Sequence, residues 1–399
     1  MGFFHESELL SEPEQSRIAQ CGICKLKKSC KSPLLPVRGA GGKKVLILTD
    51  FPTQHEDDRG KWIVGKTGQW ISDKLEGIGL NLDKDCWSSG AIICRPETKT
   101  NLPKAAGYCY PNVVELIDKL NPIAIICFGE LAMRAAVRYA YQSSPASTQT
   151  YLGWKIPAQY GNMWIMGTYH PRIVMDQKKR TTHELFMGKH LGQFDGDNIE
   201  RPYEQVPDYR TKVQLLWTPS EVADAMADMS KSKAITALDY ETNMLKPDGD
   251  DARILSASVS DGECSVAFMI TPKTLKPLVR YLKSKAKKTA CNIKFETRWS
   301  RACMGVRPRN WVWCSLQGAH IIQSAPAEFT SLKNQSFIHL GQPRYNAQVD
   351  SLLDANGTRL PNKAAEEIEQ SQLLEYNGMD TICESYVGEI QRRLLGVKV

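Results

Sequence analysis

The stretch "AITALDYET" at residues 234–242 places two acids directly after an apolar run. The run "AITAL" predicts a β-strand, and residues i and i+2 of a strand point to the same face. Asp239 and Glu241 are therefore expected side by side. Two carboxylates at such a distance raise each other's pKa unless a cation lies between them. An exposed strand end with two solvated acids is the alternative that this stretch leaves open.

Length and composition favour a two-domain globular protein. The chain has 399 residues, 42% of them hydrophobic, and a net charge of +7 that is compatible with a polyanionic partner. No stretch reaches the about 20 apolar residues that a membrane span needs, and the N-terminus lacks the core of a secretory signal. We therefore expect a cytoplasmic protein without a membrane partner. Twelve cysteines in such a compartment suggest metal or reactive roles rather than disulfides.

Strands and helices alternate along both halves of the chain. The stretches "KKVLILTD" (43–50), "GAIICRP" (90–96) and "IAIICFG" (123–129) have the apolar character of buried strands, with helical patterns between them. This alternation predicts a parallel sheet covered by helices. Residues 196–212 are polar, contain two prolines and lack periodicity, which predicts a linker. We therefore predict an α/β protein with domains at residues 1–195 and 213–399.

Three acidic sites follow the predicted linker. Asp239 and Glu241 come first, "NIKFE" (292–296) ends at Glu296, and "YNGMD" (376–380) places Tyr376 and Asp380 on one face of a helix. A strand D-x-E, then N-x-x-x-acid, then a helical Y-x-x-x-D resembles the DEDD family of 3′–5′ proofreading exonucleases that carry a tyrosine in the last motif. The later stretch "SLKNQSFIHLG" resembles a segment that this family has between its second and third motifs.

The resemblance to these exonucleases implies a ribonuclease H-like α/β fold and hydrolysis of phosphodiester bonds with two Mg²⁺ or Mn²⁺ ions. Carboxylates can hold two such ions roughly 4 Å apart, where one activates water and the other stabilises the leaving oxygen. By this resemblance Asp239, Glu241 and Asp380 bind metal, and Tyr376 orients the attacking water. It also implies that the second motif contacts DNA, through Asn292 and Lys294.

One residue of the second motif departs from the family pattern. Glu296 stands where the family normally has aspartate, and its side chain is one methylene longer. Glu296 could still bind metal or a metal-bound water, although catalysis could be slowed. A decayed nuclease fold that only grips DNA is the alternative that this departure leaves open.

Cysteines are clustered near the start of the chain. "CGICKLKKSC" (21–30) contains a C-x-x-C pair at Cys21 and Cys24, which alone could be a zinc half-site, a redox pair or chance. Cys94 opens a Cys-Arg-Pro sequence after a predicted strand, and Cys109 stands next to a predicted helix. This order resembles the iron–sulfur family of uracil-DNA glycosylases, in which these four positions bind the cluster. Four thiolates suit a [4Fe–4S] cluster or structural zinc, so the expectation of iron comes from the resemblance.

Two further stretches of the first half resemble the same glycosylase family. "ILTDFPTQHEDDRGKWIVGKTG" (47–68) is similar to its first motif, and "YHPR" (169–172) supplies its late histidine. The glycosylase-like pocket that this resemblance implies consists of four residues: Asp50, Ile63, Gly90 and His170.

Three pocket positions depart from the glycosylase pattern. Asp50 replaces a glutamate, Gly90 replaces the asparagine that reads the uracil edge, and Ile63 replaces the aromatic that stacks on the base, unless the register shifts to Trp62. A flipped base needs both stacking and hydrogen bonds to its edge. We therefore expect a glycosylase-like fold that binds DNA or a partner, and glycosylase activity is doubtful.

The order of the two halves resembles the front part of certain phage DNA polymerases of the bacterial polymerase I type. We therefore expect a metal-dependent 3′–5′ DNA exonuclease of phage replication in the bacterial host cytoplasm. It would act on single-stranded 3′ ends beside a separate DNA polymerase chain, or be a truncated piece of such a polymerase. The alternatives are an active uracil-DNA glycosylase of base repair and a non-catalytic DNA-binding subunit of the replication machinery.

Overall fold

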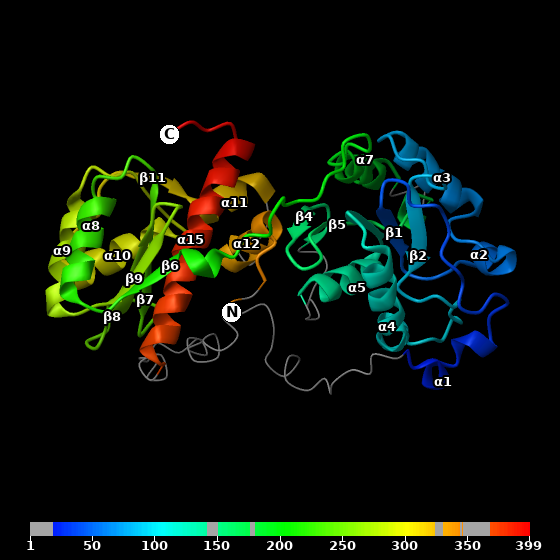
Figure 1. The fold of residues 1–399 in the computed structure, drawn as a ribbon, viewed down its shortest axis with the longest axis horizontal. Coiled ribbons are helices and arrows are strands. Elements are labelled where there is room, and N and C mark those ends of the chain that lie inside the picture. Colours follow the sequence, from blue (N-terminus) through cyan, green and yellow to red (C-terminus); the bar gives the residue numbers. More distant parts are fainter. Residues whose placement is uncertain (1–18, 142–150, 176–179, 324–329, 344, 346–367) are drawn as a thin grey trace. The chain divides into compact units, whose positions relative to one another are not determined.

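The structure is a computed structural model that describes residues 19–141, 151–175, 180–323, 330–343, 345 and 368–399. The chain divides into two compact units between Val206 and Pro207. Each unit has one β-sheet with helices packed against it (Figure 1). The predicted α/β class with two units is therefore confirmed.

The sheet of the first unit has the strand order β2-β1-β3-β5-β4. β1 pairs in parallel with β2 and β3, β3 pairs in parallel with β5, and β4 is an antiparallel edge strand. β1 and β3 are buried along their whole length, as central parallel strands covered on both faces are. The strands span Val45–Thr49 (β1), Cys86–Gly90 (β2), Ala124–Phe128 (β3), Lys155–Ala158 (β4) and Met163–Thr168 (β5).

Helices of the first unit bury apolar stripes against this sheet. Residues of α3 and α7 pack with Val45 and Ile47 of β1 in one core, and α5 contacts β3 and β5. The helical segments are α1 (Cys21–Cys24), η2 (Leu26–Lys28), α2 (Gln54–Arg59), α3 (Gly65–Glu76), α4 (Leu102–Leu120), α5 (Glu130–Tyr141), α6 (Arg172–Met175) and α7 (Arg180–Leu191).

A buried carboxylate on α2 attaches the N-terminal segment to the first unit. Asp57 is 1% exposed and accepts hydrogen bonds from the backbone N–H of Lys31 (3.1 Å) and Ser32 (2.7 Å) and from Nε of Arg95 (2.8 Å). Burial by itself raises the pKa of Asp57, but these donors outweigh it and lower the pKa below the ordinary value. The segment before β1 is therefore joined through one side chain to the residue that follows Cys94.

The sheet of the second unit has the order β11-β10-β7-β8-β9-β6 and is mixed. β7 is parallel to β10 and antiparallel to β8. The strands span Val213–Leu216 (β6), Thr236–Thr242 (β7), Ile254–Ser260 (β8), Ser265–Met269 (β9), Lys288–Ala290 (β10) and Trp311–Cys314 (β11). The helical segments are η4 (Tyr209–Lys212), α8 (Pro219–Met229), α9 (Pro272–Lys283), α10 (Ile293–Met304), α11 (Ser315–Gln323), α12 (Leu332–Leu340) and α15 (Gln370–Leu394).

The alternation of side chains along β7 separates core from site. Leu238 and Tyr240 are buried in a core that also contains residues of α8 and α9. Asp239 and Glu241 point to the opposite face, where α15 packs on β6, β7, β8 and β9. Gly378 of α15 has no room for a side chain, because a Cβ there would lie 2.4 Å from Val213. This close approach brings the backbone of α15 down to the sheet.

Part of the segment 196–212 is attached to the first unit. The N–H of Gly196 donates to the carbonyl of Ile78 (2.8 Å), and Nη1 of Arg201 donates to the carbonyl of Asn162 (2.8 Å). Residues 209–212 form η4, which contacts β6 and α15 of the second unit. Among the described helices, none combines the length and the apolar character of a membrane span.

We predict that Asp57→Ala destabilises the first unit, because it leaves the N–H groups of Lys31 and Ser32 and the guanidinium of Arg95 without their acceptor. The free energy of opening of β1, measured by hydrogen exchange in the full chain, should fall by about 2–3 kcal/mol. Asp58→Ala removes an exposed neighbouring carboxylate and should change it by less than about 0.5 kcal/mol. Equal effects of the two substitutions would contradict the role given to Asp57.

Candidate functional site

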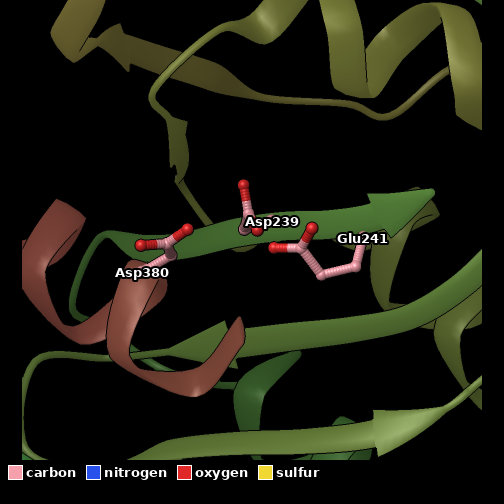
Figure 2. Close-up of side chains that lie close together, drawn as sticks. All are labelled: Asp239, Glu241 and Asp380. Carbon is pink, nitrogen blue, oxygen red and sulfur yellow. The ribbon is translucent and has the colours of Figure 1, made fainter. Parts of the chain in front are cut away.

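The acids of the second unit converge on one place. Asp239 and Glu241 come from β7 and Asp380 from α15, and a ligand oxygen of each lies within 4.8 Å of the others. Figure 2 shows the three carboxylates directed toward a common space between the strand and the helix. The strand and the helix are far apart in the sequence, so the site exists only in the folded unit.

Asn377 joins these two elements and escaped the sequence analysis. Its Nδ2 donates to Oδ2 of Asp239 at 2.6 Å, across 138 residues of sequence. The hydroxyl of Ser256 on β8 donates to Oδ1 of Asn377 at 3.1 Å, which fixes the orientation of the amide. Asn377 is fully buried. The sequence motif pointed to Tyr376 and Asp380 and gave no sign that Asn377 belongs to the site.

The acid cluster is short of positive charge. Burial, followed by the charge of Asp380, raises the pKa of Asp239 to about 8. Burial and the charge of Asp239 raise the pKa of Glu241 well above its ordinary value. Buried carboxylates in this situation require protons or cations, and hard divalent ions such as Mg²⁺ and Mn²⁺ prefer oxygen ligands of this kind. The donor set therefore fits a divalent metal site.

Glu296 lies close to this cluster and has an unsatisfied oxygen. It stands in the first turn of α10 and is 2% exposed, and its Oε2 has no hydrogen-bond partner. Burial and the charges of Asp239 and Glu241 raise its pKa well above the ordinary value. An orphaned carboxylate oxygen in a buried setting is costly unless a cation compensates it. Glu296 is nevertheless outside the group of three acids whose oxygens lie within 4.8 Å.

Two residues that sequence reasoning did not assign contact Asp380. Nζ of Lys333, in the first turn of α12, lies 2.6 Å from Oδ2 of Asp380 and 2.5 Å from Oη of Tyr376. The hydroxyl of Tyr345 donates to Oδ1 of Asp380. The only sequence signal for Lys333 was its place in the "SLK" segment, and nothing in the sequence pointed to Tyr345.

The two residues predicted to contact DNA stand at the start of α10. Asn292 is its half-buried N-cap, and its side chain makes no capping hydrogen bond. Lys294 is exposed. Their predicted contact with DNA stays a prediction.

In the first unit, the four predicted cluster cysteines line one pocket. Cys21 and Cys24 lie on α1, Cys94 follows β2 and Cys109 lies on α4, and all four line the same pocket. The N–H of Gln20 donates to the carbonyl of Tyr108 at 3.1 Å and holds α1 against α4. Segments from three parts of the sequence are thus brought to one site.

Hydrogen bonds to two of the thiols fit a role as metal ligands. The N–H of Leu34 donates to Sγ of Cys94 (3.3 Å), and Nδ2 of Asn112 donates to Sγ of Cys109 (3.4 Å). Such donors stabilise thiolates that bind metal. Four thiolates suit structural zinc or a [4Fe–4S] cluster.

Asp50 and His170 of the glycosylase-like pocket are engaged with backbone. Oδ1 of Asp50 accepts from the N–H of Ala132 at 3.0 Å in the first turn of α5, and burial raises its pKa to about 6. Nδ1 of His170 accepts from the N–H of Arg172 at 3.2 Å, and burial lowers its pKa to about 4. His170 is therefore neutral near pH 7, and Asp50 acts as a cap of α5.

Trp62 fills the space next to Gly90. A Cβ at Gly90 would lie 2.5 Å from the indole ring of Trp62, which is fully buried. Ile63 is also buried and has a φ of 53°. Of the two candidate positions, Trp62 is the one whose side chain lies beside Gly90. An asparagine at position 90 would overlap this ring. The absence of a side chain at position 90 and the position of the Trp62 ring therefore depend on each other.

Comparison with known proteins shows what the first unit is similar to. Residues 36–189 match the family profile of the uracil DNA glycosylase superfamily. The type-4 uracil-DNA glycosylase of Pyrobaculum aerophilum is 28% identical over 189 residues, which cover 46% of this chain and 92% of that protein. The predicted likeness of the first unit to uracil-DNA glycosylases is thereby confirmed.

Solved structures of nucleases also match part of the chain. Escherichia coli RNase D, an exoribonuclease involved in structured RNA processing, has a TM-score of 0.35 at 17% identity and covers 46% of this chain and 44% of that chain. Brucella melitensis NrnC with bound Mg²⁺ has a TM-score of 0.34 at 18% identity and covers 46% of this chain and 80% of that chain. The function of the second unit is therefore interpreted from its own acid cluster.

We expect the four cysteines to hold a metal cluster, and we predict that Cys94→Ser removes it, because one of its four thiolates would be lost. Anaerobically purified full chain should contain iron and sulfide and be brown, and the variant should lose the colour and most of the iron. Cys264→Ser, in the second unit, should retain both. Zinc instead of iron in the unsubstituted chain, or full iron content in Cys94→Ser, would contradict the assignment.

We predict that adding a single methyl group at Gly90 destabilises the first unit, because it collides with the buried ring of Trp62. Gly90→Ala should lower the free energy of unfolding by about 1–3 kcal/mol. Gly107→Ala, in the middle of α4 with open space around it, should leave stability unchanged or raise it by up to about 1 kcal/mol. Denaturant unfolding of the two variants measures the difference, and a neutral Gly90→Ala would show that Trp62 can move aside.

Proposed function

We propose that the second unit is a metal-dependent 3′–5′ exonuclease that digests DNA from single-stranded 3′ ends. The observation that supports this proposal is the convergence of Asp239 and Glu241 on β7 with Asp380 on α15, with ligand oxygens within 4.8 Å. Burial and mutual repulsion raise the pKa values of Asp239 and Glu241, so the cluster favours a bound cation. An exposed strand end with solvated acids, the alternative left open by the sequence, would show neither burial nor convergence.

Each side chain of the site has a part in this proposal. Asp239, Glu241 and Asp380 hold two Mg²⁺ or Mn²⁺ ions, and Glu296 offers its unpartnered oxygen to one of them or to its water. When bound, such ions supply a nucleophile from water at neutral pH and stabilise the leaving 3′ oxygen. Tyr376 orients the attacking water with its hydroxyl. The charge of the ions also relieves the repulsion among the carboxylates.

DNA is the proposed substrate because of the first unit. Its relatives are uracil-DNA glycosylases by name, and a unit of this kind on the same chain would bring DNA to the nuclease. Asn292 and Lys294 at the start of α10 would contact the strand that enters the site. A proofreading role in phage replication, beside a separate DNA polymerase chain in the host cytoplasm, is the setting that the order of the two units favours.

We propose that the first unit binds DNA or a partner and carries a [4Fe–4S] cluster on Cys21, Cys24, Cys94 and Cys109. The cluster would join α1 to α4 and so anchor the N-terminal segment. Uracil excision is the second candidate function, favoured by the family match at residues 36–189. The ring of Trp62 against Gly90 opposes it, because the space for a side chain that reads a base edge is filled.

We predict that the full chain with Mg²⁺ shortens a 5′-labelled single-stranded oligonucleotide stepwise from its 3′ end. Asp239→Ala combined with Glu241→Ala should reduce this rate by about a thousandfold or more, because the carboxylates that hold the ions are removed. The matched control removes two exposed acids of the same unit, Asp248 and Glu263, and should keep full activity.

Two further measurements complete this test. Mn²⁺ should raise the unfolding temperature of the unsubstituted chain but not that of the Asp239 and Glu241 double variant, because a bound ligand stabilises the folded state. A uracil-containing oligonucleotide should yield no free uracil. DNA binding without digestion in Mg²⁺ or Mn²⁺ would support the non-catalytic alternative, and equal digestion by both double variants would refute the assigned site.

A further inference from the structure

Lys333 stands at an electrostatically unfavourable place in its own helix. It is the second residue of α12, after the N-cap Ser331, whose side chain accepts from the N–H of Asn334. A cation in the first turn opposes the positive end of the helix dipole. The ammonium group is instead held by Oδ2 of Asp380 (2.6 Å) and Oη of Tyr376 (2.5 Å), in a side chain that is 30% exposed. The contacts of Lys333 therefore belong to the acid site.

The chemistry of these contacts fixes the direction of the Tyr376 hydroxyl. A lysine ammonium has three donors and no acceptor, so Oη of Tyr376 must accept the hydrogen bond from Lys333. The proton of Tyr376 then points away from Nζ. The Lys333 ammonium also lies 4.5 Å from the centre of the Tyr376 ring, so Lys333 contacts both the ring and the hydroxyl of Tyr376.

The nearest acceptor for that proton is already supplied with donors. Tyr376 and Asp380 lie one turn apart on α15, where a hydroxyl could donate to the carboxylate. Oδ2 of Asp380 receives Lys333, and Oδ1 receives the hydroxyl of Tyr345. Both oxygens of Asp380 thus have a donor without Tyr376. Asp380 therefore does not depend on the Tyr376 hydroxyl as a donor, and the proton of Tyr376 can be directed at a bound water or a phosphate oxygen.

We propose that Lys333 is a positioning residue that holds the Tyr376 hydroxyl with its proton directed at the attacking water or at a phosphate oxygen of the bound strand. This inference rests on the proposed nuclease function and names the group that keeps Tyr376 productive. Lys333 acts through Tyr376, so its removal should matter only while the tyrosine hydroxyl is present. A lysine that merely neutralises Asp380 would not show this dependence.

A double-mutant cycle in the full chain tests the proposal, with digestion of a single-stranded oligonucleotide in Mg²⁺ as the measurement. Lys333→Met keeps the length of the side chain and removes its donors, and kcat should fall about 10- to 100-fold with KM for the strand within about twofold. Tyr376→Phe should have a similar effect. The double variant should be no more than about twofold slower than Tyr376→Phe, because both changes remove one function.

Two comparisons separate positioning from charge. Lys276→Met, on the exposed side of α9, makes the same chemical change elsewhere in the unit and should keep full activity. Mn²⁺ should bind Lys333→Met as tightly as the unsubstituted chain or more tightly, because a competing cation is gone. A loss of kcat would then not come from a loss of metal, and weaker Mn²⁺ binding in Lys333→Met would overturn the proposal.

The outcomes distinguish this inference from the proposed function. Without digestion by the unsubstituted chain the nuclease function fails, and the role of Lys333 fails with it. Digestion by the unsubstituted chain with independent, multiplying losses from the two substitutions overturns the positioning role alone, as does full activity of Lys333→Met. If Lys333→Met does not fold, the cycle is run with Lys333→Ala, for which the same loss and the same dependence on Tyr376 are expected, and Lys333→Arg, which retains a donor-only cation, should keep most of the activity.

Discussion

Repulsion between closely spaced, partly buried carboxylates is the constraint on which the second unit depends. Asp239, Glu241 and Asp380 have oxygens within 4.8 Å of one another, and like charges at that distance away from water are costly. The fold offsets part of the cost with three donors, from Asn377, Lys333 and Tyr345. The remaining repulsion favours the binding of a cation. Stability and function thus place opposite demands on the same few atoms, as is common where chemistry takes place.

The first unit is also of the α/β class, and its N-terminal segment is attached to the sheet and helices by side-chain contacts. Its N-terminal segment is too short to make a core, and it is held instead by side-chain contacts to the rest of the unit. Asp57 binds its backbone, and four cysteines from α1, α4 and the end of β2 line one pocket. Trp62 packs against Gly90, one of the positions that the sequence predicted for a glycosylase-like pocket. A shared fold therefore does not by itself imply a shared activity, because function depends on a few side chains and the fold on many.

Much of the site could be predicted because its parts are local patterns. Asp239 and Glu241 share a face through the two-residue repeat of a strand, and Tyr376 and Asp380 share one through the turn of a helix. The cysteine spacing and the polar segment near residue 200 are likewise visible in one dimension. Lys333, Tyr345 and Asn377 carry no such pattern. A lysine two residues into a helix is ordinary in sequence, and only its contact with Asp380 makes it part of the site.

Periodicity and composition thus specified the α/β class and the two units, because each is a regularity between neighbours along the chain. The acid motifs and the set of cysteines were assigned through resemblance to known families. Tertiary packing decided which groups meet. The close approach of α15 to the sheet at Gly378 brings Asp380 to β7, and the same packing gives Asn377 and Lys333 their partners. It also decided that Trp62 and not Ile63 lies against Gly90. Hydrogen bonds and steric overlap act over a few ångströms in space, whatever the distance along the chain, and no pattern in one dimension encodes them.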